Sequence, residues 1–201
     1  MNYKTIFTLA LIYIYGCAGG SGSMEFTSAK TAARTEKNLV KAEEWGLKAL
    51  KVPSDSTNAL VPYFLAVDVY RPQKKWLEMA KMFDEAIRRN PEQKLDKPKF
   101  LIDPEEITKE NAKESIAYTI QQGINAYRNQ EWSIVFNLAV DYMQKDKLDK
   151  ALEYLMIAKE IYLNKNSNFQ VMAEIYIAKG NLNKALFIAN EGLILFPESG
   201  G

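Results

Sequence analysis

Residues 169–197 read FQVMAEIYIAKGNLNKALFIANEGLILFP, and residues 135–163, which begin 34 positions earlier, read VFNLAVDYMQKDKLDKALEYLMIAKEIYL. In both stretches apolar residues recur three or four positions apart, which is the spacing of amphipathic helices. Residues of one size class occupy the same places in both: Val135 and Phe169, Ala139 and Ala173, Tyr142 and Tyr176, Ala151 and Ala185, Ala158 and Gly192. A pattern repeated at a fixed period indicates a repeat architecture.

Two further copies of the pattern precede these stretches. A clear copy carries the same internal offsets at Tyr63, Ala66, Val67, Tyr70, Trp76, Met79, Phe83, Ala86 and Pro91. A weaker copy comprises Phe26, Ala29, Ala33, Leu39, Ala42, Gly46 and Ala49, with Pro53 one position early. Because strand-like alternation is scarce from Met24 onward, the body of the chain is expected to be all-α.

The recurring small residues have a packing role. Two helices approach closely where the side chains between them are small, as at Ala139 and Ala151, and an aromatic such as Tyr142 fills the remaining space. Proline ends the second helix of a pair at Asn90-Pro91 and Phe196-Pro197, because it restricts the residue before it and cannot donate to the helical ladder.

The order of large, small, aromatic and small residues with a closing proline resembles the tetratricopeptide repeat family. The resemblance implies an α-solenoid of antiparallel helix pairs over residues 25–199, with three clear repeats, one weak and one degenerate. The degenerate unit is expected at residues 92–131, where the signature is absent. There we expect an irregular loop from Lys94 to Ile102, a helix start at residues 103–106 and a change in the direction of the superhelix.

The helix of this degenerate unit is expected to be long. Asp103 would be its N-cap, and Pro104 would occupy the first helical position. The helix would then run to about Asn129, with one apolar face formed by Ile116, Ile120, Ile124 and Tyr127.

The first residues indicate export. Thr5 to Tyr15 form an apolar stretch of 11 residues after Lys4, which is too short for a membrane-spanning helix of roughly 20 residues. A basic residue, a short apolar region and small residues are typical of a signal peptide, assigned here to residues 1–16. Residues 17–24 would form a flexible tether.

Cys17 is the only cysteine and lies where the apolar stretch ends, in Ile14-Tyr15-Gly16-Cys17. This sequence resembles the lipobox of bacterial lipoproteins, although Tyr15 departs from its usual pattern. The resemblance implies cleavage before Cys17 and lipid attachment to its thiol, which would anchor the chain at a membrane of the bacterial envelope. The alternative is ordinary cleavage after Ala18, which would give a soluble periplasmic protein.

Composition argues against several classes of function. The chain has no histidine and a net charge of +1, which removes His-based catalytic triads and gives no reason to expect a nucleic-acid partner. No phosphate loop or dinucleotide fingerprint occurs. We therefore expect no enzymatic activity, no catalytic residues, no cofactor and no metal site.

The tetratricopeptide resemblance also implies a protein-binding groove lined by the first helix of each repeat. Carried across by register, the candidate groove residues are Phe64, Asp68, Arg71, Phe136, Val140, Met143, Gln170, Glu174 and Ile177. The lysine and asparagine set with which chaperone-binding members hold a terminal carboxylate is absent from these positions. An apolar strip of this kind accepts an amphipathic helix or an extended hydrophobic segment.

The sequence thus predicts a membrane-tethered protein-interaction scaffold of the cell envelope, with other proteins as partners. The rival functions are a soluble periplasmic module that binds a peptide or glycan, and a non-catalytic subunit of an envelope complex. No polar capping helix follows the last apolar segment, which ends at Pro197. Repeat arrays require such a cap, so we expect further repeats, a partner or a second copy of the chain to cover that end.

Overall fold

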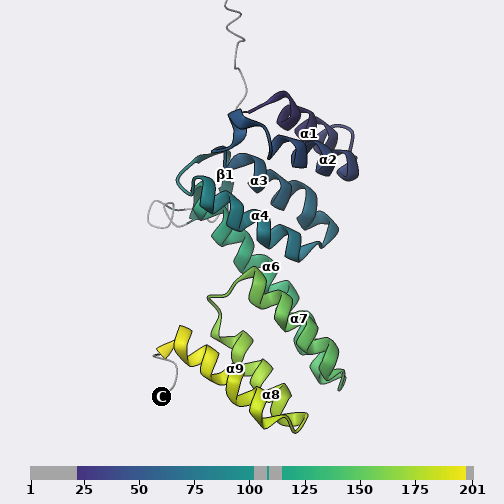
Figure 1. Ribbon diagram of the computed structural model, residues 1–201, viewed down its shortest axis with the longest axis vertical. Coiled ribbons are helices and arrows are strands. Elements are labelled where there is room, and N and C mark those ends of the chain that lie inside the picture. Colours follow the sequence, from purple (N-terminus) through teal and green to yellow (C-terminus); the bar gives the residue numbers. More distant parts are fainter. Residues whose placement is uncertain (1–21, 102–107, 109–114, 198–201) are drawn as a thin grey trace, which may run out of the picture.

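The computed structural model describes residues 22–101, 108 and 115–197, which form an elongated stack of helix pairs (Figure 1). The helices are α1 (Met24–Arg34), α2 (Leu39–Ala49), α3 (Leu60–Phe64), α4 (Trp76–Arg89), α6 (Ile120–Gln144), α7 (Leu148–Ile161), α8 (Asn166–Ala178) and α9 (Leu182–Leu195), with a short 3₁₀ turn η1 (Pro53–Asp55). They pack in the pairs α1–α2, α3–α4, α6–α7 and α8–α9. The predicted solenoid of paired helices is therefore confirmed.

Helix ends follow the local sequence. Ser23 and Asn38 cap α1 and α2 by accepting hydrogen bonds from backbone N–H groups of the first turn. The helices α4 and α9 end immediately before Asn90-Pro91 and Phe196-Pro197, as predicted. The turn between α8 and α9 contains Gly180 with a φ of +72°, a conformation that glycine adopts without steric cost.

The first helix of the second pair is irregular. α3 continues into a π-helical segment, η2 (Leu65–Tyr70), and a 3₁₀ turn, η3 (Arg71–Gln73). At the end of η2 the N–H of Arg71 donates to the carbonyl of Ala66, five residues earlier. Pro72 lacks the N–H that an α-helix would donate to the carbonyl of Asp68, so the α-helical ladder does not pass through this point.

The expectation of a wholly helical body is wrong at residues 94–100 and 116–119. The strands β1 (Lys94–Phe100) and β2 (Ile116–Thr119) pair antiparallel, with Lys94 opposite Thr119 and Phe100 opposite Ile116. The predicted loop is thus largely a strand. Pairing explains the difference, because residues 94–100 hydrogen-bond to residues 116–119, further along the chain, and Leu95 packs against the core.

The predicted helix of the degenerate unit is also placed differently. Ile116 belongs to β2, and α6 begins only at Ile120, after a capping box formed by Thr119 and Gln122. The predicted helix start at residues 103–106 lies outside the described residues. The predicted end near Asn129 is wrong, because α6 continues without a break for 25 residues. No glycine or proline occurs between Gly123 and Gln144 to interrupt it.

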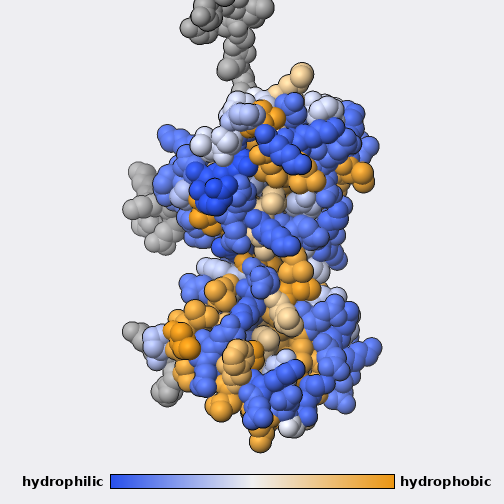
Figure 2. Space-filling view, in the orientation of Figure 1, coloured by the Kyte–Doolittle hydropathy of each residue, from blue (hydrophilic) through white to orange (hydrophobic). Residues whose placement is uncertain are grey.

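Helix α6 packs against both halves of the molecule. Ile120 and Ile124 are buried in a core shared with α1–α4, whereas Ala139 is buried in a second core formed with α7, α8 and α9. Figure 1 shows α6 crossing from one group of helices to the other, and Figure 2 shows the corresponding two lobes joined by a narrower waist.

Two adjacent side chains of α6 fix these contacts. Glu131, whose side chain is 6% exposed, accepts hydrogen bonds from Arg71 Nε at 2.6 Å and Trp76 Nε1 at 3.3 Å. Trp132 donates from Nε1 to Asn168 Oδ1 in α8 at 2.9 Å. One turn of α6 is thereby hydrogen-bonded to the second helix pair on one side and to the fourth on the other.

The predicted signal peptide at residues 1–16 and Cys17 lie outside the described residues. Of the predicted tether, residues 22–24 are described. Ser23 donates its N–H to the carboxylate of Asp55, and Met24 is already the first residue of α1. None of the helices in the described part of the chain has both the length and the apolar character needed to cross a bilayer.

Replacing Glu131 by alanine should lower the free energy of unfolding by about 1–3 kcal/mol, because Arg71 and Trp76 lose a buried acceptor. The matched control is Glu153→Ala, which breaks an exposed ion pair with Lys150 and should cost less than about 1 kcal/mol. Urea unfolding followed by circular dichroism measures both. Equal losses in the two variants would contradict the role given to Glu131.

Candidate functional site

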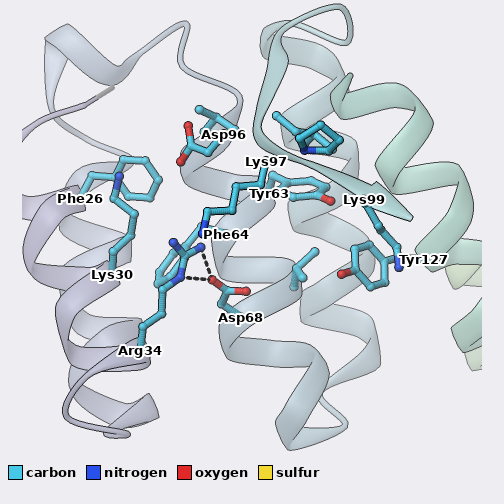
Figure 3. A pocket seen from close by; sticks show the side chains of 14 residues that line it. Phe26, Lys30, Arg34, Tyr63, Phe64, Asp68, Asp96, Lys97, Lys99 and Tyr127 are labelled. Atoms are coloured by element: carbon cyan, nitrogen blue, oxygen red, sulfur yellow. Dashed lines mark hydrogen bonds and ion pairs between the residues drawn. The ribbon is translucent and has the colours of Figure 1, made fainter. Parts of the chain in front are cut away.

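A cavity of about 440 Å³ lies between α1, the α3–η2 segment, β1 and α6 (Figure 3). The floor is apolar and the rim is charged. The lining residues are Phe26, Lys30, Arg34, Leu60, Tyr63, Phe64, Val67, Asp68, Leu95, Asp96, Lys97, Pro98, Lys99 and Tyr127. Its volume is within the range of roughly 300–1,000 Å³ that is usual for ligand sites.

Aromatic rings form much of the floor. Phe26 of α1 meets Phe64 of α3 edge to face, with ring centroids 5.6 Å apart. Tyr63 of α3 and Tyr127 of α6 are 6.3 Å apart. Burial raises the pKa of both tyrosines above its usual value, so both phenols stay neutral near pH 7.

The rim carries more positive than negative side chains. Arg34 donates from Nε at 2.9 Å and from Nη2 at 2.6 Å to one carboxylate oxygen of Asp68. Lys30 and Lys99 have their Nζ atoms 4.4 Å and 3.8 Å from the ring centroids of Phe26 and Tyr127. Within the described residues, neither of these lysines nor Lys97 makes an ion pair with a carboxylate.

The environment of Lys99 disfavours its charge. Burial and, to a smaller extent, the guanidinium of Arg71 hold the pKa of Lys99 below its usual value. Arg71 itself lies 4.9 Å from the ring centroid of Tyr127 while it pairs with Glu131. A nearby anion would raise the pKa of Lys99 again, because it would favour the protonated form of the lysine.

The irregular backbone beside the cavity positions Asp68. This residue belongs to η2, the π-helical segment between α3 and η3. Segments of this kind are rare and occur frequently at functional sites. The pairing of Arg34 with Asp68 links α1 to η2 across the cavity, as Figure 3 shows.

The predicted groove residues are divided among three places. Phe64 and Asp68 line the cavity, and Arg71 contacts its wall through Tyr127. Phe136 stacks on Trp132, and it and Met143 pack against the second core, with Val140 partly buried on the same helix. In α8, Gln170 lines a separate cavity of about 190 Å³, while Glu174 and Ile177 are exposed.

Sequence reasoning missed the residues that complete the cavity. Lys97 and Lys99 come from β1, which was predicted to be loop, and Tyr127 was assigned to the apolar face of a helix. Lys30 and Arg34 lie one helical turn apart on α1. Two signals in the sequence could have indicated these residues. One is the weak first repeat, and the other is the spacing of Lys97 and Lys99, which places both on one face of a strand.

A second surface feature lies on the last helix. In α7, Leu152 is covered by its surroundings and is 8% exposed, whereas Leu186, at the equivalent position of α9, is 63% exposed. Phe187 and Ile194 are also exposed, where α7 has Glu153 and Glu160. Figure 2 shows apolar side chains gathered on this lobe.

The described residues contain no group of three or more cysteine, aspartate or glutamate side chains that could hold a metal ion. The carboxylate of Asp68 is paired with Arg34, and that of Glu131 with Arg71. In the described part of the chain, the cavity thus combines paired carboxylates and unpaired lysines with an apolar floor.

No protein-family model matches the chain, and no curated protein matches it. Among solved structures, one similar chain is YrrB, described as a TPR protein with an unusual peptide-binding site, at 18% identity, 87% coverage of this chain, 86% of that chain and a TM-score of 0.33. Another is MamA, at 15% identity, 85% and 89% coverage and a TM-score of 0.32.

A third similar structure, residues 41 to the end of MamA from Desulfovibrio magneticus RS-1, shares 9% identity over 90% of this chain and all of that chain, with a TM-score of 0.33. Similarities of this size transfer no ligand or partner. The helical-repeat fold rests on the helix pairs described above, and solenoids of such pairs present concave binding surfaces.

Removing the positive charge of Arg71 should raise the pKa of Lys99, because a neighbouring cation disfavours protonation. The double variant Arg71→Gln, Glu131→Gln avoids leaving Glu131 as an unpaired buried carboxylate, and its comparison with Glu131→Gln alone isolates the charge of Arg71. Lysine-selective NMR titration measures the pKa, and the other lysine resonances provide an internal reference. A pKa that is unchanged or lower would show that Arg71 does not act on Lys99.

Proposed function

We propose that this chain is a protein-interaction scaffold tethered to a membrane of the bacterial cell envelope. The observation that carries the proposal is the cavity of Figure 3, where α1, the α3–η2 segment, β1 and α6 present aromatic and basic side chains to one space. Protein partners are recognised by such combinations of apolar anchors and charged rims.

The tether is inferred from Cys17 and the sequence before it. Lipid attached to this cysteine would confine the scaffold to a surface, and confinement raises the effective concentration of whatever the scaffold binds. Ser23 and Met24 begin the folded body only six and seven residues after Cys17. A tether of that length would hold the first helix pair close to the membrane.

A second candidate is a subunit of an envelope complex that docks through α9. The exposed Leu186, Phe187 and Ile194 favour it, because contiguous apolar surface marks interaction sites. In this case too the chain acts by binding other proteins, and the two candidates differ in the surface used.

Metabolic labelling with a radioactive fatty acid in a bacterial host tests the tether. The wild-type chain should incorporate label, and Cys17→Ser should not, because the thiol is the attachment point. An unlabelled wild type would exclude the lipoprotein and leave the soluble periplasmic module, whereas label that persists in Cys17→Ser would exclude Cys17 as the attachment point.

Site-specific photo-cross-linking tests which surface binds partners. Cross-linkers at Glu174 and Ile177 of α8 probe the predicted groove, and those at Glu153 and Met156 of α7 are matched controls, since Ile177 and Met156 are both 57% exposed. If the groove binds a partner protein, a discrete cross-linked adduct should form from the α8 positions and not from the α7 positions. If the α7 positions gave equal adducts, or the α8 positions gave none, the groove residues of α8 would not belong to the binding surface.

A further inference from the structure

We propose that the cavity between α1, α3, β1 and α6 binds an extended peptide segment in which carboxylate side chains flank an aromatic residue. The inference rests on the proposed protein-binding function and names the chemistry that one of its sites recognises. It concerns residues of β1 and α1 that lie outside the groove predicted from the repeat pattern.

Charge favours an anionic segment. The cavity is lined by four basic side chains and two acidic ones. The carboxylate of Asp68 is already bound by Arg34, whereas Lys30, Lys97 and Lys99 make no ion pair within the described residues. Lysines gathered beside an apolar floor gain more from a carboxylate than lysines in open solvent, since the local dielectric constant is lower.

The positions of the lysines favour carboxylates at two separated points. In Figure 3, Lys30 lies beside Phe26 at one end of the cavity, and Lys99 lies beside Tyr127 at the other, with Lys97 reaching from β1 between them. A single compact anion would contact only one end. An extended chain with an acidic residue on each side of its anchor reaches both.

The floor favours an aromatic anchor. Phe26, Phe64, Tyr63 and Tyr127 bring ring faces and edges into one space, and aromatic rings in such surroundings pack edge to face or in offset stacks. The cavity volume of about 440 Å³ admits one large side chain with its neighbouring backbone. The neutral phenols of Tyr63 and Tyr127 add no repulsion toward an acidic segment.

The site depends on β1. The helix pairs alone would provide Phe26, Lys30, Arg34 and Phe64, but Lys97 and Lys99 come from the strand inserted between α4 and α6. Leu95 on the same strand is packed into the core. That packing fixes the neighbouring residues over the cavity.

Fluorescence anisotropy with the full chain carrying Cys17→Ser tests the proposal. The probe is dye-labelled Gly-Glu-Phe-Glu-Gly-amide, whose blocked carboxyl end excludes recognition of a terminal carboxylate. The matched probes replace both glutamates by glutamine, or the phenylalanine by serine. The acidic aromatic peptide should bind with a dissociation constant at least about ten-fold lower than that of either matched probe. Added salt should weaken its binding.

A triple variant, Lys30→Gln, Lys97→Gln and Lys99→Gln, should weaken binding about ten-fold or more. The control carries Lys51→Gln, Lys81→Gln and Lys145→Gln, which replaces three exposed lysines away from the cavity, and should stay within about two-fold. Lys97→Gln alone, at an exposed strand position, should weaken binding measurably even if the triple variant folds poorly.

Three results would overturn the proposal: equal binding of the glutamine peptide, equal losses in the two triple variants, or no saturable binding at millimolar chain concentration. The cross-linking adducts from α8 are measured independently of these peptides. If the adducts form and the peptides do not bind, the ligand class is wrong while the scaffold function stands.

Discussion

The structure depends on one helix that both lobes share. The hydrogen bonds of Glu131 to Arg71 and Trp76, and of its neighbour Trp132 to Asn168, attach a single turn of α6 to helix pairs on opposite sides. Adjacent helical residues project about 100° apart, which is why consecutive positions can serve different partners. A break in α6 at this turn would disrupt both sets of hydrogen bonds and leave the packing of α7 on α4, seen at Trp76 and Tyr154, as a remaining direct contact between the lobes.

The cavity follows from the same constraint. Tyr127 lies one turn before Glu131, so the contacts that hold α6 also set the ring that forms one end of the cavity. Arg71 connects the two features, because it pairs with Glu131 and lies over Tyr127. The β1 strand closes the space, and its lysines add to the positive charge of Lys30 and Arg34 on α1. Binding chemistry is thus placed where the regular repeat is interrupted.

The repeat pattern predicted the helix pairs because small residues such as Ala139 and Ala158 are required wherever two helices approach closely. It also placed Phe64 and Asp68 beside the cavity. It failed between the first and second clear repeats. There, residues 94–100 alternate too weakly to be recognised as a strand, and their pairing partner lies further along the chain, in residues 116–119. The repeat period predicts two helices where α6 is one, because residues 124–144 contain no glycine or proline to end a helix.

Most of the candidate site could not be predicted from the 34-residue repeat period. Lys97, Lys99 and Tyr127 meet through pairing and packing between segments far apart in the sequence, and a local pattern carries no information about such contacts. On α9, Leu186 and Phe187 are exposed.

Residue-resolved amide hydrogen exchange across residues 120–144 tests most directly whether α6 is one continuous helix that joins the two lobes. Beyond the first turn, whose N–H groups have no partner within the helix, the amides from Ile124 to Gln144 should exchange slowly as one block that includes residues 129–132. Fast exchange confined to residues 129–132, between two protected segments, would show two helices and contradict the shared-helix account.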